Sequence, residues 1–330
     1  MLSKIPTGAL PRIRERLKPK QKELKMISND KKLIAVFGAT GNQGAGVVRA
    51  LKAKSQFKVR ALSRAPGKYQ GLADEVVAAD LERPETLAAA LEGAHGVFLV
   101  TNFWQEGTDE IRQATTAVQA AKAAGINHLI WSTLPDVEAI SGGKINAPQF
   151  AGKAKVDSIV KDAGFPYHTF VMPPCYYQNF SGEFGPQKQP DGSFGWVLPI
   201  DPAVRCFHMG DISELGNIVA GAFAHPDETG NGAYLPLVGD FLSFNDIVGT
   251  LRQQGHELSF TRVPQEIFAG FFPGAAALGE TLAYFETYTY LGPRSFDDEI
   301  ALANKVAGKK PATFATWAWE NFRLKAVDHA

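Results

Sequence analysis

The chain has 330 residues, 45% of them hydrophobic and 21% charged, which is the composition of a globular protein large enough to bury a sizeable core. Its 34 basic residues balance 34 acidic ones, so no net field favours a direct nucleic-acid partner or an anionic membrane. Two cysteines, Cys175 and Cys206, give no disulfide framework, and no run approaches the ~20 apolar residues of a membrane span, so we expect a cytoplasmic protein.

Residues 1–31 differ in composition from the rest of the chain. Eight basic residues and two glutamates stand among the first 25, with one serine and three prolines. An organelle presequence is rich in arginine and serine and poor in acidic residues. We therefore interpret residues 1–31 as a basic, disordered arm. Organelle targeting, nuclear shuttling and a true start near Met26 are left as alternatives.

From Lys32 onward, short apolar runs alternate with segments that have apolar residues at helical spacing. The runs predict strands at 33–37, 57–62, 75–79, 96–100, 128–132 and 167–171, and the other segments predict helices at 44–53, 84–91, 109–124 and 148–163. Continuous apolar strands separated by helices are typical of a parallel sheet covered on both faces. Right-handed crossovers then give a doubly wound, Rossmann-type α/β domain at 32–172, with ligands at the carboxyl ends of its strands.

After residue 172 the pattern changes. Residues 173–210 are rich in glycine, proline and aromatic side chains, and they predict long loops over a pocket. Asp211 and Glu214 resemble a capping box that begins a helix, and Ser243 is expected to cap another. Aromatic-rich helices follow from Gln265. We expect residues 173–330 to form a smaller α/β lobe for substrate or partner, interleaved with the first domain and covering its pocket.

A glycine turn follows the first predicted strand directly. Its members are Gly38, Ala39, Thr40, Gly41, Asn42, Gln43 and Gly44. Glycines here let the backbone approach a pyrophosphate, and the N–H groups of the next helix point at it. A turn that needed glycine for steric reasons alone would leave its polar members unexplained. The turn therefore predicts a dinucleotide site.

The second predicted strand indicates which dinucleotide is bound. NAD-selective sites place a carboxylate about 20 residues on for the ribose 2′-hydroxyl, whereas an arginine there suits a 2′-phosphate. This strand ends in Ser63 and Arg64, with Lys68 four residues later and no carboxylate nearby. Arg64 can hold a phosphate with two hydrogen bonds, and Lys68 adds a point charge. We predict NADP(H); a solvated surface pair is the alternative.

Two further strand ends carry candidate cofactor contacts. Asp80 and Leu81 follow the third strand, where an adenine would lie, although Asp80 can also cap the next helix. Thr101, Asn102 and Phe103 follow the fourth strand and suit the ribose and nicotinamide, although an aromatic side chain can also belong to the core.

Taken together, these residues resemble the NmrA-like family of atypical short-chain dehydrogenases, and most closely its redox-sensor branch, from about Lys32 to Phe322. The resemblance rests on VFGATGNQG (36–44), FKVR (57–60), VTNFW (100–104), FAGK (150–153) and PCYYQN (174–179). It implies further cofactor contacts at Arg112, Lys153, Tyr176, Tyr177, Gln178 and Asn179. No short motif anchors Arg112.

Short-chain dehydrogenases use a tyrosine as general acid or base, assisted by a lysine four residues later. By this resemblance Lys153 stands on the expected helix, but Gln149 replaces the tyrosine, and an amide cannot deliver a proton. Ser132 stands where a substrate-orienting serine would be. Tyr176 or Tyr177 is an alternative proton donor. The candidate catalytic residues are therefore Lys153, Tyr176 and Ser132.

Two functions are compatible with this sequence. In the first, the protein is an NADP(H)-binding regulator that reports the NADPH/NADP+ ratio to a regulatory protein partner. In the second, it is an NADPH-dependent reductase of a quinone, carbonyl or related small aromatic molecule. No GxSxG or P-loop sequence occurs, and His256-Glu257 lacks the second histidine of HExxH, so we expect no metal. A homodimer is left open.

Overall fold

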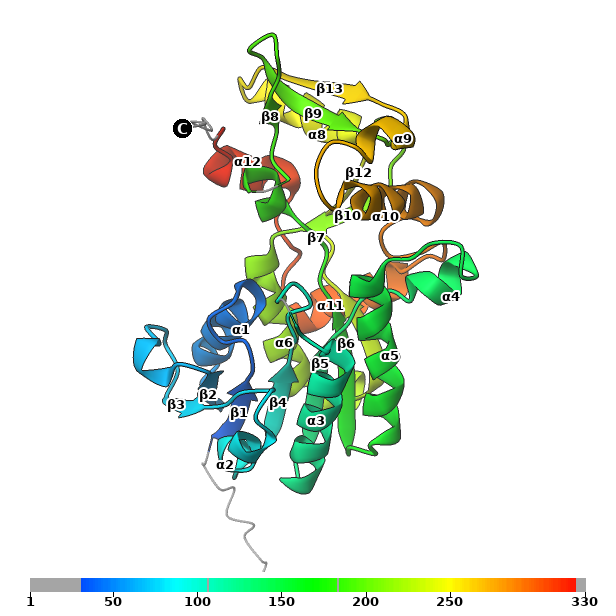
Figure 1. Cartoon of the computed structure of the whole chain (residues 1–330). Helices are drawn as coiled ribbons and strands as arrows, with labels where there is room; N and C mark the ends of the chain where they lie inside the picture. The colour runs from blue at the N-terminus through cyan, green and yellow to red at the C-terminus, as the bar shows by residue number, and fades with distance from the viewer. Residues whose placement is uncertain (1–30, 106, 183, 325–330) are drawn as a thin grey trace, which may run out of the picture. The chain divides into compact units, whose positions relative to one another are not determined.

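A seven-stranded sheet, all of whose neighbouring strands are parallel, organises the site (Figure 1). The computed structural model describes residues 31–105, 107–182 and 184–324, so nearly all of the predicted basic arm lies outside the described residues. The strands of the sheet are β1 (Lys32–Val36), β2 (Phe57–Ser63), β3 (Glu75–Ala78), β4 (Gly96–Leu99), β5 (His128–Ser132), β6 (Tyr167–Met172) and β11 (Asn231–Pro236).

The strand order is β11-β6-β5-β4-β1-β2-β3, which confirms the doubly wound fold. The six predicted strands occur within one residue of their expected limits. Because the chain runs outward from β1 in both directions, the connections after β1 and β4 diverge at the carboxyl ends of these strands, and sheets of this topology form their ligand-binding crevice at such a switch point. The crevice is where the ligand of such a sheet binds.

Helices cover both faces of the sheet, and the sheet separates two hydrophobic cores. One face carries α1 (Asn42–Ala53), α6 (Leu215–Ala224) and α11 (Asp297–Ala307); the other carries α2 (Leu87–Leu91), α3 (Glu110–Ala123) and α5 (Pro148–Asp162). Helix α1 buries Val47, Val48 and Leu51, each contributing about 1.5–3 kcal/mol. Lys52 in its last turn suits the negative end of the helix dipole. This packing fixes the glycine turn from which α1 starts.

The chain crosses the boundary predicted near residue 173 more than once. The edge strand β11 pairs with β6, and helices α6 and α11 pack on the sheet, although all three follow that boundary in the sequence. The division into domains at 32–172 and 173–330 stays a prediction.

The prediction of long loops at 173–210 is wrong. This segment contains β7 (Cys175–Tyr176), the 3-10 helix η3 (Tyr177–Ser181), β8 (Gln187–Lys188), β9 (Phe194–Leu198) and β10 (Phe207–Gly210). Strands β9 and β10 pair with β13 (Leu258–Arg262) and β12 (Asp240–Leu242). These partner strands come from much later in the chain, so no local sequence pattern predicts the pairing.

The capping predictions have different outcomes. Ser243 forms a complete capping box with Asp246 at the start of α8 (Phe244–Gln253). The Asp211 side chain accepts a hydrogen bond from the Ser213 N–H, but Glu214 does not return to the cap. Glu214 binds Lys309 and the backbone N–H of Ala312 instead, because the C-terminal segment offers it a tertiary partner.

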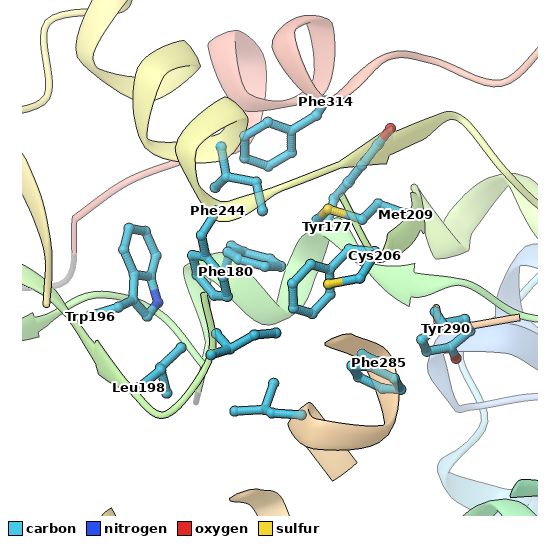
Figure 2. Close-up of a cluster of buried hydrophobic side chains, with 14 of the residues drawn as sticks. Tyr177, Phe180, Trp196, Leu198, Cys206, Met209, Phe244, Phe285, Tyr290 and Phe314 are labelled. Atoms are coloured by element: carbon cyan, nitrogen blue, oxygen red, sulfur yellow. The ribbon is translucent and has the colours of Figure 1, made fainter. Parts of the chain in front are cut away.

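A third core fills the C-terminal part of the chain, and Figure 2 shows Tyr177, Phe180, Phe244 and Phe314 within it. The remaining helices are η1 (Pro66–Lys68), η2 (Pro84–Thr86), α4 (Val137–Ser141), η4 (Ile212–Glu214), α7 (Pro226–Thr229), α9 (Gln265–Phe268), α10 (Ala275–Tyr288) and α12 (Phe314–Asn321). Among the described residues, no helix is both long and apolar enough to cross a membrane.

Candidate functional site

The glycine turn packs tightly at the point where β1 and β4 diverge. Gly38 has a φ of +63°, which favours glycine, and a Cβ added to it would lie 2.9 Å from a methyl group of Val100. A Cβ added to Gly44 would lie 2.2 Å from the carbonyl oxygen of Gly38. Glycine at these two positions therefore lets the turn pack directly on Val100 and on the start of α1, and this tight turn fits a pyrophosphate site.

The start of α1 leaves its first-turn N–H groups for an anion. Gly41 is the N-cap and supplies no side chain, and the first turn contains no acidic residue. Thr40, Gly41 and Asn42 are exposed, while Ala39 and Gly44 are buried below them. Unpaired N–H groups and the positive end of the helix dipole together favour phosphate at this position.

Arg64 and Lys68 lie after β2, the neighbour of β1. Both side chains are exposed, and neither takes part in an ion pair within the part of the chain that the structure describes. The Arg64 Nη1 donates a hydrogen bond of 2.7 Å to the Gln105 side chain. Two uncompensated positive charges beside the turn suit the 2′-phosphate of NADP(H).

The predicted contacts after β3 form a small polar cluster. Asp80 accepts hydrogen bonds from the Glu82 N–H at 3.0 Å and from Arg83, so it closes its own turn. Leu81 is partly buried. Arg112, in the first turn of α3, forms an ion pair with Glu82. The structure thus brings Arg112 to the region of Asp80 and Leu81.

Lys153 belongs to a buried ion pair that the sequence did not predict. Its Nζ lies 2.6 Å from Oε1 of Glu110, and it also donates to the carbonyl and hydroxyl oxygens of Thr101. The Thr101 hydroxyl donates to the same Glu110 oxygen at 2.7 Å. Burial lowers the pKa of Lys153, and the carboxylate of Glu110 opposes this effect. Asn102 and Phe103 follow Thr101, and Asn102 is exposed.

Asp157, on α5, is a second buried acidic residue besides Glu110, and it leads to a prediction about the pH dependence of stability. Burial raises the pKa of Asp157 to about 6, although the Tyr234 hydroxyl donates to it at 2.8 Å. Between about pH 4 and pH 6 the folded chain therefore holds a proton that the unfolded chain has lost. The contribution of Asp157 to the free energy of unfolding is present at low pH and falls by about 3 kcal/mol as the pH rises through this window.

Asp157→Asn is expected to remove this fall. Urea unfolding between pH 4 and pH 7 should give a free-energy difference between the two proteins that changes with pH. The exposed Asp162 on the same helix supplies the control, Asp162→Asn. Parallel curves for Asp157→Asn and the unchanged chain would contradict the prediction.

Ser132 and Tyr176 meet through Gln43 of the glycine turn. The Ser132 hydroxyl donates to Oε1 of Gln43 at 2.7 Å, and Nε2 of Gln43 donates to the Tyr176 hydroxyl at 3.0 Å. Burial raises the pKa of Tyr176 to about 12, so its hydroxyl keeps its proton near neutral pH. This arrangement leaves that proton free to donate to a ligand.

Tyr177, Gln178 and Gln149 have hydrogen-bond partners away from the glycine turn. Tyr177 is fully buried in the C-terminal core (Figure 2). Its hydroxyl lies within hydrogen-bond distance of Asp240 and of the carbonyl of Ala312. Gln178 binds Asp211, and Asn179 is exposed. Gln149 donates to the Thr281 hydroxyl of α10. The structure therefore brings Tyr176 to the glycine turn but does not bring Tyr177 there.

Sequence reasoning missed Glu110 and Gln105. Glu110 is an acidic first-turn residue of α3, which suits any helix start, so its sequence position does not reveal the ion pair. The available signal was Lys153 itself, because a lysine in a buried helix face requires a counter-charge. Gln105 carries no comparable signal.

Comparisons with known proteins point to one family over most of the chain. A sequence profile of the NmrA-like family matches residues 30–318. The NmrA-like family domain-containing oxidoreductase FrzB of a Cladobotryum species is 30% identical, with 85% of this chain and 91% of FrzB covered. The nitrogen metabolite repression protein nmrA of Emericella nidulans is 29% identical, with 72% and 70% covered.

The solved structures include NmrA, described as a negative transcriptional regulator, in complex with NADP. Its TM-score is 0.71 at 26% identity, with 88% of this chain and 95% of that chain covered. NmrA in complex with NAD gives a TM-score of 0.72 at the same identity and coverage.

Proposed function

The chain belongs to the NmrA-like family, and we propose that it is an NADP(H)-binding regulator that reports the NADPH/NADP+ ratio to a protein partner. The observation that carries the proposal is the tight turn at Gly38 and Gly44, from which the first-turn N–H groups of α1 start without a side-chain cap, as a pyrophosphate site requires. The NADP complex of the related NmrA supports the same assignment.

Residues at the switch point would supply contacts for each part of the dinucleotide. The glycine turn and the start of α1 would hold the pyrophosphate, and Arg64 with Lys68 would hold the 2′-phosphate. Thr101 and Ser132, at the ends of β4 and β5, stand on the opposite side of β1 from Arg64, where the nicotinamide half would reach.

Two features favour regulation over catalysis. Gln149 replaces the usual proton donor and is bonded to Thr281. Lys153 is held by Glu110 and Thr101, so its ammonium already has three hydrogen-bond acceptors. The Glu110 carboxylate compensates the charge that would lower the pKa of a neighbouring acid, and no N–H of Lys153 is left to donate to it.

Binding without turnover tests the proposal. The full chain is titrated with NADPH and NADP+ by calorimetry and is then incubated with NADPH and a panel of quinones and aldehydes. We expect both nucleotides to bind and the nicotinamide absorbance to stay constant. Turnover that disappears in Tyr176→Phe or Lys153→Ala would overturn the regulator in favour of a reductase.

The reductase is a second candidate because of Tyr176. When bound, NADPH supplies hydride chemistry, and a reductase also needs a proton for the substrate oxygen. Ser132 and Gln43 direct the protonated Tyr176 hydroxyl so that its hydrogen is free. The oxidoreductase named among the relatives supports this candidate, and a quinone, carbonyl or small aromatic molecule would be its substrate.

Arg64 is expected to set the preference for NADP(H) over NAD(H). Arg64→Ala should weaken NADPH binding about 10–100-fold, because a charge-assisted, two-bond phosphate contact is worth about 1.5–3 kcal/mol. NADH binding should change little. Arg49→Ala, an exposed arginine on α1, is the control. An unchanged ratio of the two dissociation constants in Arg64→Ala would show that another residue selects the phosphate.

A further inference from the structure

The buried pair of Glu110 and Lys153 lies where the nicotinamide half of the cofactor would reach. Lys153 donates to both oxygens of Thr101, which stands two residues after the end of β4. Val100, the residue before Thr101, lies against Gly38 of the glycine turn. Thr101 and Val100 thus connect the ion pair to the glycine turn, on the side of β1 away from Arg64.

The pair is neutral as a whole, and its two charges are desolvated. The side chains of Lys153 and Glu110 are 10% and 4% exposed. The second carboxylate oxygen of Glu110 has no hydrogen-bond partner among the described residues, although it is buried. The negative charge of Glu110 is therefore compensated mainly by Lys153, and a change in either residue leaves one net charge beside the crevice.

NADP+ and NADPH differ in the charge of the nicotinamide ring and share their adenosine, 2′-phosphate and pyrophosphate. Contacts of Arg64 or of the glycine turn therefore cancel in the ratio of the two affinities. A fixed charge near the ring does not cancel, since it acts on the cationic ring of NADP+ and hardly on the neutral ring of NADPH.

We propose that Glu110 sets the relative affinity for NADP+ and NADPH by neutralising Lys153 beside the nicotinamide site. This inference rests on the proposed NADP(H) binding and names the groups that would read the redox state. Glu110 acts here through Lys153, as a charge-compensating and positioning residue. A purely structural role, in which the pair only ties Thr101 to α3, is the competing explanation.

Glu110→Gln, Lys153→Met and the double variant separate the two explanations. Glu110→Gln leaves a positive charge and should raise the ratio of the NADP+ dissociation constant to that of NADPH about tenfold. Lys153→Met leaves a negative charge and should lower the ratio by a similar factor. The double variant is neutral again, and its ratio should return to within about threefold of the unchanged chain.

The dissociation constants are measured by calorimetry at about pH 6.5, because burial lowers the pKa of Lys153 and a lower pH favours its charged form. The exposed pair of Glu138 and Lys155, on α4 and α5, supplies the controls Glu138→Gln and Lys155→Met, which should leave the ratio unchanged. Damage to the fold weakens both nucleotides together, so it cannot produce shifts of opposite sign.

The outcomes separate this inference from the function on which it rests. If the unchanged chain binds neither nucleotide, the proposed function is wrong and the inference fails with it. If the unchanged chain binds both, but the two single variants shift the ratio in the same direction or not at all, the inference alone is overturned. Opposite shifts with recovery in the double variant support it.

Discussion

Gly44→Ala is expected to weaken the binding of NADPH at least about 100-fold, which corresponds to about 2.7 kcal/mol. The added methyl group would lie 2.2 Å from the carbonyl oxygen of Gly38, a backbone atom that cannot rotate away. The turn and the first turn of α1 must then separate, and the N–H groups lose their common direction toward the phosphate. Calorimetry with NADPH measures the loss.

Gly249→Ala is the matched control for this change. Gly249 also lies inside a helix, α8, but a Cβ added there meets no atom within 4 Å. Alanine in a helix interior is about 1 kcal/mol more favourable than glycine, so this variant should bind NADPH normally and be slightly more stable. Retained NADPH affinity in Gly44→Ala would mean that the dinucleotide lies elsewhere.

Glu110→Gln is expected to lower the free energy of unfolding by about 3–5 kcal/mol near neutral pH. The change leaves the Lys153 ammonium buried without a counter-charge, and burial already lowers the pKa of this lysine. Urea unfolding followed by circular dichroism measures the loss. The double variant with Lys153→Met should regain most of it, because no uncompensated charge remains.

Glu138→Gln is the control that shows how much burial of an ion pair affects the free energy of unfolding. Glu138 and Lys155 are separated by 2.9 Å, but their side chains are 57% and 54% exposed. Exposed pairs contribute about 0–1 kcal/mol. A loss in Glu110→Gln no larger than that in Glu138→Gln would show that solvent reaches the buried pair and that its charges need no compensation.

The sheet could be predicted because its evidence is local. Each strand of 32–172 is a short apolar run, and each helix between them repeats its apolar residues at helical spacing. The segment 173–210 lacked such evidence, since β9 and β10 are completed by β13 and β12 from much later in the chain. Strand pairing over such a distance depends on the tertiary fold.

Some residues of the candidate site could likewise be predicted from the sequence, and others could not. Gly38 and Gly44 could be recognised from the sequence because a tight turn between a strand and a helix requires glycine at these positions. Arg64 could be recognised because it is a basic residue at the end of the second strand. The neighbouring tyrosines Tyr176 and Tyr177 are indistinguishable in the sequence. Tyr176 ends β7 and reaches Gln43, whereas Tyr177 begins η3 and reaches Asp240.

The sequence by itself determined the doubly wound sheet, the glycine turn and the positive charge beside it. Each of these depends on backbone geometry or on side chains within a few residues of one another. Only the tertiary structure decided that Glu110 neutralises Lys153 and that Gln43 joins Ser132 to Tyr176. Those partners lie 43, 89 and 133 residues apart, and they meet because α3 packs against α5 and because the carboxyl ends of parallel strands share one edge of the sheet.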